Sequence, residues 1–322
     1  MNTNLLSHNP SLEDGKMDNA ARNTKIASKQ TYYTIRLLAD RDRMQDAFRS
    51  YAYYRWLDDQ LDTDLNSQLE KITLLSRQQE LLEACYGGEK VDITYPEEQM
   101  LVELVKNDIE ENSGLQTYLR DMMAVMAFDV ERQGRVISQA ELKQYSQLLS
   151  TAVREYMFYF FGHCYQSHNS PNRYLAVQGA HITHMLRDLM DDVDIGYINI
   201  PAELLAEEQI SLDQLHGQAL RQWVAERVKL AHRYFEAGRK YIAGVKSKRC
   251  RLAGFAYLAC FEWMLRVIEG DQYYLRRAYP ERKSLKATMW MVWRVFTWWL
   301  NTYSVSRESQ VPVAISEQYE ET

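Results

Sequence analysis

Residues 185–194 read Met-Leu-Arg-Asp-Leu-Met-Asp-Asp-Val-Asp, and the fold prediction starts from this stretch. It places Asp188 and Asp192 four residues apart, so both carboxylates lie on one face of a helix, one turn apart. A second stretch far upstream, residues 54–62 (Tyr-Arg-Trp-Leu-Asp-Asp-Gln-Leu-Asp), repeats this spacing with Asp58 and Asp62. Apolar residues are interleaved with the acids in both stretches, which favours partly buried helices over freely solvated charge runs. We therefore expect two helices that each present a pair of carboxylates.

Carboxylates at this spacing repel one another unless a cation lies between them. Mg²⁺ binds carboxylate oxygen and keeps coordination positions open for water and phosphate. Each stretch also carries an arginine, Arg55 or Arg187, and a guanidinium can hold phosphate oxygens with two hydrogen bonds. The alternative is an acidic helix surface that is simply solvated. Because the motif occurs twice, we predict two metal-binding helices that face each other across a cleft.

Composition limits the function classes. The chain has 322 residues, of which 46% are hydrophobic and 25% charged, as in ordinary globular proteins. A formal net charge of -6 argues against general nucleic-acid binding. The four cysteines lack metal-binding spacing, which predicts reduced thiols in a cytoplasmic protein. They are Cys85, Cys164, Cys250 and Cys260. We find no signal peptide and no apolar run as long as a membrane span.

Helical periodicity and capping residues predict an all-α chain. Ser67 with Glu70, Ser138 with Glu141, and Ser211 with Gln214 fit the capping box. The expected helices cover residues 29–38, 41–63, 67–86, 96–112, 115–133, 139–165, 172–194, 212–246, 249–278 and 282–302. We expect a flexible tail at 1–24, one helical domain at 25–303 and a polar tail at 304–322. The aromatic stretch 287–303 is expected to be a core helix, and the alternative is peripheral contact with a membrane surface.

Several segments together resemble the squalene/phytoene synthase family, the head-to-head trans-prenyltransferases. The two aspartate stretches resemble the two signatures of the family, and the second is followed by Gly196 and Ile200-Pro201. Ser28-Lys29 resembles the N-terminal segment of the family, and residues 264–277 resemble its C-terminal part. The similarity covers residues 27–286.

This resemblance implies an isoprenoid-synthase-like helical bundle with a central apolar cavity. It also implies that two prenyl diphosphates, farnesyl or geranylgeranyl, are condensed through a cyclopropyl diphosphate to a squalene- or phytoene-type hydrocarbon. Ionisation needs a neutralised diphosphate and a dry cavity that protects the allylic cation from water. NADPH use stays open, because the chain has no glycine-rich nucleotide loop after a strand. Prenyl chain length and oligomeric state also stay open.

The resemblance assigns roles to individual residues. Arg55 is expected to act in catalysis and to bind diphosphate, together with Lys29, Arg187 and Arg277. Tyr51 and Phe261 are expected in the cavity. Mg²⁺ is assigned to Asp58, Asp62, Asp188 and Asp192, with Asp59 and Asp191 as second choices.

The chain departs from the family pattern at His181 and His184, where the family has Gln and Asn. With Asp188 they form a stripe along one helix face. We predict that both contact diphosphate and that His184 also binds metal. Neutral imidazole suits Mn²⁺, Fe²⁺ or Zn²⁺ better than Mg²⁺, so an unusual metal preference is one expectation and a cationic histidine at the diphosphate is the other. Further differences, which affect cavity shape and the second half-reaction, are Gln30-Thr31, residues 150–154, Tyr197 and Phe261.

Other functions remain as alternatives. A family member could ionise a single prenyl diphosphate and then cyclise or hydrolyse it. A non-catalytic lipid-binding or assembly factor could use the same scaffold, although the intact aspartate pairs argue against it. A di-iron helical bundle is disfavoured, because the chain contains no Glu-x-x-His.

Overall fold

The structure is a computed structural model that describes residues 19–62, 67–162, 170–212 and 215–305. Over these ranges the chain forms helices and no strand, and Val136 and Ile198 make an isolated parallel bridge. The predicted all-α class is therefore confirmed. The chain divides into two compact units, residues 1–111 and 112–322. Each unit is described by itself, and their union in the single domain expected at 25–303 stays a prediction. Most of the two expected tails, and Cys164, lie outside the described residues.

The first unit contains five described helices: α1 (Asn19–Ala27), α2 (Lys29–Leu38), α3 (Met44–Leu61), α4 (Gln68–Tyr86) and α5 (Glu98–Asn107). Helix α3 contacts α1, α2 and α5 and buries Phe48 and Leu57. Helix α1 corrects the sequence prediction, because residues 19–24 were assigned to a flexible tail. Its buried face, Ala20, Ala21 and Thr24, packs on α3 and explains why this short polar segment is helical.

A buried carboxylate links α4 and α5. Glu98 is fully buried and accepts two 3.0 Å hydrogen bonds from Arg77 and one of 2.8 Å from Gln78. It also accepts a hydrogen bond from the backbone N–H of Thr94. Burial alone would raise the pKa of Glu98, but these hydrogen bonds outweigh it and lower the pKa. The side chain of Glu98, in the first turn of α5, therefore fixes the segment that precedes the helix, and α5 begins two residues later than the predicted start at 96.

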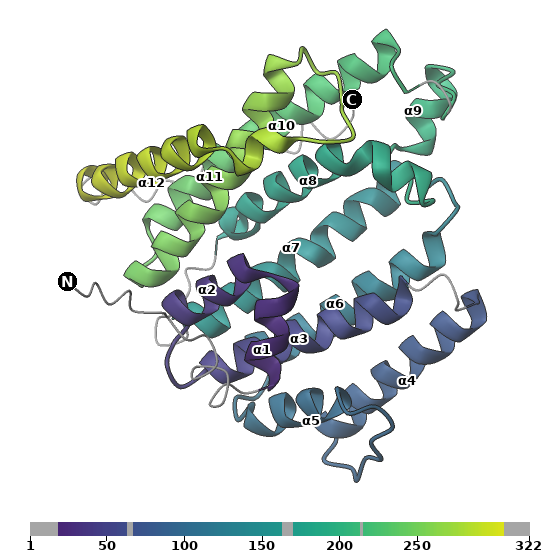
Figure 1. The fold of residues 1–322 in the computed structure, drawn as a ribbon, viewed down its shortest axis with the longest axis vertical. Coiled ribbons are helices and arrows are strands. Elements are labelled where there is room, and N and C mark those ends of the chain that lie inside the picture. Colours follow the sequence, from purple (N-terminus) through teal and green to yellow (C-terminus); the bar gives the residue numbers. More distant parts are fainter. Residues whose placement is uncertain (1–18, 63–66, 163–169, 213–214, 306–322) are drawn as a thin grey trace, which may run out of the picture. The chain divides into compact units, whose positions relative to one another are not determined.

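The second unit contains α6 (Gly114–Arg132), α7 (Gln139–Gly162), α8 (Leu175–Asp194), α9 (Ala202–Glu207), α10 (Gln218–Ala243), α11 (Lys248–Gly270) and α12 (Leu285–Val305). Short 3-10 helices, η3 (Pro171–Tyr174) and η4 (Pro280–Lys283), precede α8 and α12. Helix α8 packs against α7, α10 and α11 (Figure 1). Its apolar face, which includes Ala180, Leu186 and Leu189, belongs to the main core of this unit.

Two glycines let α8 and α10 approach closely. A Cβ on Gly238 of α10 would lie 2.6 Å from the backbone nitrogen of Ala176 on α8. A Cβ on Gly179 of α8 would lie 2.8 Å from the ring of Phe235 on α10. Neither distance leaves room for a Cβ atom, so the close packing of α8 on α10 requires glycine at both positions.

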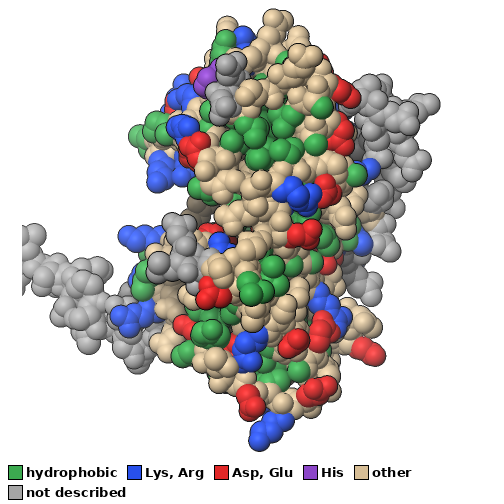
Figure 2. All heavy atoms as spheres, turned by 90° about the vertical axis from the view of Figure 1, so that its right-hand side faces the viewer, with side chains coloured by type: hydrophobic (Ala, Val, Ile, Leu, Met, Phe, Trp, Pro, Cys, Tyr) green, Lys and Arg blue, Asp and Glu red, His purple; other side chains and the backbone are tan. Residues whose placement is uncertain are grey.

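Capping chemistry predicted most helix starts. The capping box of Ser67 and Glu70 is present at α4, and Ser138 and Glu141 exchange the same two hydrogen bonds before α7. The predicted start at 212 is wrong, because α10 begins at Gln218 after Gly217. Gln214 of that expected capping box lies outside the described residues. Figure 2 shows one face of the molecule, where acidic and basic side chains are mixed with hydrophobic ones.

Candidate active site

The first aspartate pair lies at the C-terminal end of α3. Leu57 and Leu61 are buried and anchor this turn of the helix, which leaves the acidic positions on the outer side. Asp62 is the C-cap residue, and its backbone N–H donates to the carbonyl of Asp58 at 2.9 Å. Asp58 and Asp62 are therefore one turn apart, as predicted. Partial desolvation raises the pKa of Asp62, although Arg55 lowers it.

Arg55 contacts the acids of its own helix. Its guanidinium donates to Asp58 at 3.2 Å and also pairs with Asp59. The pKa of Arg55 is raised, mainly by the hydrogen bond to Asp59. Because all three side chains are about half exposed, the pairing holds Arg55 loosely.

Two further predicted residues lie in the first unit. Lys29 is exposed in the first turn of α2, where Ser28 caps the helix by accepting from the backbone N–H of Thr31. Tyr51 is partly buried on α3. It lies close enough to Arg55 to contribute to the raised pKa of Arg55. Their roles in diphosphate binding and in the cavity stay predictions.

The second aspartate pair lies in the last two turns of α8. Asp188 accepts a 2.6 Å hydrogen bond from Nε of Arg187 and lies 3.0 Å from Nε2 of His184. Burial would raise the pKa of Asp188, but the hydrogen bonds from Arg187 and His184 hold it well below its usual range. Asp188 is therefore firmly ionised. His184 is about half exposed at 53% and can turn toward a ligand.

Asp192 has the opposite electrostatic environment. Burial and the neighbouring charge of Asp188 raise the pKa of Asp192 from 3.8 to about 6. Its described hydrogen-bond donor is Asn199, at 2.9 Å. One turn of α8 thus carries a carboxylate that ionises easily and a second that resists ionisation.

A chain of buried and partly buried polar groups connects Asp192 to α6 and α7. Asn199 accepts a 2.7 Å hydrogen bond from Arg132, which is 4% exposed. Arg132 also pairs with Asp129 at 2.7 Å, and Asp129 accepts from the hydroxyl of Tyr145 at 3.0 Å. The guanidinium of Arg132 lies over the ring of Tyr145, 4.7 Å from its centroid. This chain fixes the orientation of the Asp192 carboxylate.

Sequence reasoning missed this chain. One signal was available, because Asn199 is a polar residue between Ile198 and Ile200, both of which are buried. The turn that precedes Asn199 contains Gly196, whose φ is +90°. The carbonyl of Gly196 accepts a 2.8 Å hydrogen bond from the backbone N–H of Gly134. A Cβ on Gly196 would lie 3.0 Å from that nitrogen.

His181 is buried rather than exposed toward a ligand. Its ring packs against Tyr145, with centroids 5.2 Å apart, and neither ring nitrogen has a hydrogen-bond partner among the described residues. Burial, more than the neighbouring cations, lowers the pKa of His181 to about 3. A contact between His181 and diphosphate at neutral pH would therefore use a neutral imidazole, whereas a cationic histidine is one of the two alternatives expected from the sequence.

Arg277 reaches the C-terminal end of α8 from the segment after α11. It pairs with Asp194, with one contact at 3.3 Å, and lies 3.5 Å from Asp191. The pKa of Arg277 is raised, mainly by the hydrogen bond to Asp194. The fold therefore places four residues that the sequence singled out in the last three turns of α8, namely His184, Arg187, Asp188 and Asp192. Arg277 lies at the same end of the helix, against Asp191 and Asp194.

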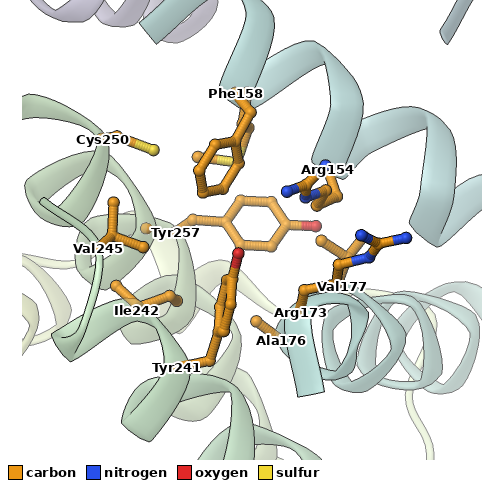
Figure 3. Close-up of a pocket in the computed structure, with 12 residues that line it drawn as sticks. Arg154, Phe158, Arg173, Ala176, Val177, Tyr241, Ile242, Val245, Cys250 and Tyr257 are labelled. Atoms are coloured by element: carbon orange, nitrogen blue, oxygen red, sulfur yellow. The ribbon is translucent and has the colours of Figure 1, made fainter. Parts of the chain in front are cut away.

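An apolar cavity lies between α7, α8, α10 and α11 (Figure 3). The side chain of Tyr257 extends between Phe158 and Tyr241, with its hydroxyl toward Arg154. Burial raises the pKa of Tyr257. Val177 on α8 also lines the cavity, eleven residues before Asp188, or about 16 Å along the helix axis. Helix α8 thus has a cavity wall near its start and carboxylates near its end.

Two positions singled out in the sequence, Arg154 and Phe261, lie in or near this cavity. Arg154 lines it and belongs to the stretch 150–154 where the sequence departs from the family pattern. Phe261 does not line it, but its ring lies 4.9 Å from that of Tyr257, which does. The part of Phe261 in a substrate cavity stays a prediction.

Among the described residues, no group of three or more His, Cys, Asp or Glu side chains is arranged to hold a metal ion. Asp58 with Asp62, and Asp188 with Asp192, are two-carboxylate sites within separate units. Their meeting around shared cations stays a prediction.

Comparisons with known proteins follow this geometry. The sequence model of the squalene/phytoene synthase family matches residues 24–290. The fold is similar to that of a squalene synthase from Alicyclobacillus acidocaldarius, with a TM-score of 0.63 and 18% identity over 80% of this chain and 94% of that one. It is also similar to a dehydrosqualene synthase in complex with a ligand, with a TM-score of 0.64 and 16% identity over 88% of this chain and 95% of that one. A comparison with curated protein sequences gives no match. At these identities the structural likeness shows the fold.

Proposed function

The chain belongs to the squalene/phytoene synthase family and is a prenyltransferase-type enzyme, and from this premise we propose that it joins two allylic prenyl diphosphates head-to-head in a metal-dependent reaction. The proposed substrates are farnesyl or geranylgeranyl diphosphate. The product would be a squalene- or phytoene-type hydrocarbon, formed through a cyclopropyl diphosphate. The observation that carries the proposal is that the matched region, residues 24–290, contains both aspartate pairs, one at the C-terminal end of α3 and one near the end of α8.

The carboxylates are chemically suited to a divalent cation. The pKa of Asp192 is raised to about 6 by burial and by the charge of Asp188, so ionisation of this second carboxylate is unfavourable beside the first. A hard cation would remove this cost and is the natural partner of such oxygens. Asp58, Asp62, Asp188 and Asp192 would hold Mg²⁺, and His184 would add a ligand that favours Mn²⁺. When bound, the ion would neutralise diphosphate and make it a better leaving group.

Basic side chains would bind and orient the diphosphate. Arg55 is half exposed, and its ion pairs among the described residues are to Asp58 and Asp59 of its own helix, which it can exchange for phosphate oxygens. Arg277 is 58% exposed at the end of α8 and can make the same exchange from Asp194. Arg187 would position Asp188 through its 2.6 Å hydrogen bond. Lys29 is exposed and would add a further cation.

Apolar side chains would protect the carbocation. The lining of the cavity in the second unit includes Phe158, Val177, Ile242 and Tyr257, which would keep water from a bound carbocation. Aromatic faces also attract a cation. Arg154 gives this cavity a charged wall, so a prenyl chain that entered it would lie along the apolar side.

The test uses the purified full chain with farnesyl and geranylgeranyl diphosphate. We expect diphosphate release with Mg²⁺ or Mn²⁺ and none with EDTA. Asp58→Asn and Asp188→Asn should each lower the rate at least about 100-fold, because each removes charge stabilisation of the leaving group. Glu131→Gln, at an acid 75% exposed, is the matched control and should leave the rate unchanged. No release by the wild type with either metal would favour a lipid-binding or assembly factor on this scaffold.

A further inference from the structure

Helix α12 has two apolar faces, and one of them packs against α11. The ring of Trp298 lies 5.8 Å from that of Phe255, and Trp290 lies 5.5 Å from Trp263. Arg294, the internal charge of this helix, donates to Glu262 on α11 at 3.0 Å. This face therefore has its partners within the second unit.

The opposite face carries a row of exposed hydrophobic side chains, here called the α12 stripe. Each is between 50% and 74% exposed. At 100° per residue these positions fall within an arc of about 100°, and they extend about 22 Å along the helix. The members of the stripe are Leu285, Met289, Val292, Trp293, Phe296 and Leu300. Single exposed hydrophobic residues are normal, but a continuous row of this size marks an interaction surface.

Basic residues border the start of the stripe. The sequence contains no Asp or Glu from Arg282 to Val305. Arg282, Lys283 and Lys286 are exposed at the start of the helix, and none makes an ion pair with another described residue. The face in Figure 2, by comparison, mixes acidic and basic side chains.

The far end of α12 is also bordered by lysines. The guanidinium of Arg251 lies 5.1 Å from the ring of Trp299, so the start of α11 lies beside the last turns of α12. Lys246 and Lys248, at this start, are exposed. The apolar stripe is thus flanked by positive charge at both ends.

We propose that the α12 stripe docks onto the surface of a membrane that contains anionic lipids. Hydrophobic and Trp side chains at one level favour the zone between head groups and acyl chains. Lysines at the edge attract anionic head groups while their methylene stems stay on the apolar side. Among the described residues, no helix is both long enough and apolar enough to cross a bilayer. The helix would therefore lie in the plane of the surface.

Charge favours a membrane over a second copy of this chain. A two-fold pair of α12 helices would bring the basic start or end of one helix against a basic end of the other. Like charges so placed oppose association. An anionic surface complements both ends at once. This surface is independent of the diphosphate chemistry, so failure of one proposal leaves the other standing.

Flotation of the purified full chain with lipid vesicles tests the proposal. We expect it to float with vesicles of phosphatidylcholine and phosphatidylglycerol, and more weakly with phosphatidylcholine alone. Val292→Glu with Phe296→Glu should lower affinity for the mixed vesicles at least about tenfold, because two side chains no longer enter the interface. Met289→Glu with Leu300→Glu, a second pair on the stripe, should lower affinity for the mixed vesicles to a similar extent. Leu69→Glu with Ile72→Glu, at exposed apolar positions of α4, is the matched control and should float as the wild type does.

Substitution of the basic residues beside the stripe should affect only the binding that depends on anionic lipid. Lys283→Glu with Lys286→Glu should weaken binding to mixed vesicles by about fivefold per lysine and leave binding to phosphatidylcholine unchanged. The proposal is overturned if the wild type does not float with mixed vesicles, or if both stripe variants float as well as the control. It is also overturned if light scattering shows that Val292→Glu with Phe296→Glu converts a dimer to a monomer while binding to vesicles stays unchanged.

Discussion

Replacement of Asp192 by Asn should stabilise the metal-free protein while removing its activity. The pKa of Asp192 is raised from 3.8 to about 6 by burial and by Asp188. A shift of about two units corresponds to about 3 kcal/mol. Solvent screening of this partly buried side chain reduces the effect to about 1–2 kcal/mol. Asn at 192 keeps an oxygen that can accept from Asn199 but carries no charge.

The pH dependence follows from the direction of the shift. Because the pKa is higher in the folded chain than in the unfolded chain, the folded state binds more protons between these values. The free energy of unfolding of the wild type therefore falls as the pH rises from about 4 to about 6. Asp192→Asn removes this contribution, so its advantage should be absent near pH 4 and complete above about pH 7.

Thermal unfolding followed by circular dichroism in EDTA measures this difference. At pH 8 we expect the midpoint of Asp192→Asn to lie a few degrees above that of the wild type. Asp191→Asn, at an exposed neighbour on the same helix, is the control and should change stability by less than about 0.5 kcal/mol. Added Mg²⁺ should stabilise the wild type more than Asp192→Asn. An Asp192→Asn variant that is less stable than the wild type at pH 8 in EDTA would refute the reasoning.

Three further substitutions probe the surroundings of the C-terminal end of α8. Asn199→Ala leaves buried Arg132 without one acceptor and should cost about 1–3 kcal/mol in urea unfolding, and an unchanged midpoint would show that water replaces Asn199. Arg277→Ala should raise KM for the prenyl diphosphate at least about tenfold with little loss of stability, since its ion pairs are exposed. An unchanged KM would remove Arg277 from the substrate site. Gly196→Ala should lower stability by about 1–3 kcal/mol, because φ is +90° and the new Cβ would meet Gly134. A wild-type midpoint for Gly196→Ala would mean that this turn relaxes freely.

Local sequence patterns predicted the helices well. Helix α2 has the predicted bounds 29–38, and the capping boxes at Ser67 and Ser138 are confirmed. Such features depend on residues three or four apart, which a sequence displays directly. Short helices were missed, because α1 and α9 owe their formation to packing and to the turn after Pro201 rather than to a periodic run.

Long-range pairs limited prediction of the candidate site. The link from Arg132 to Asn199 joins residues 67 positions apart, and no spacing rule reports such a contact. The approach of Arg277 to the end of α8 was suggested only by resemblance to the family, and its pairing with Asp194 was not foreseen. Burial of His181 also escaped prediction, because a histidine on a helical stripe gives no sign of which side faces Tyr145.

The ratio of diphosphate released to hydrocarbon formed tests the central claim most directly. The purified chain is incubated with Mg²⁺ and farnesyl or geranylgeranyl diphosphate, with and without NADPH, and the hydrocarbon is identified by mass spectrometry. Head-to-head joining predicts two diphosphates per hydrocarbon and a product with twice the carbon number of the substrate. One diphosphate per product, with the carbon number of a single substrate, would contradict it.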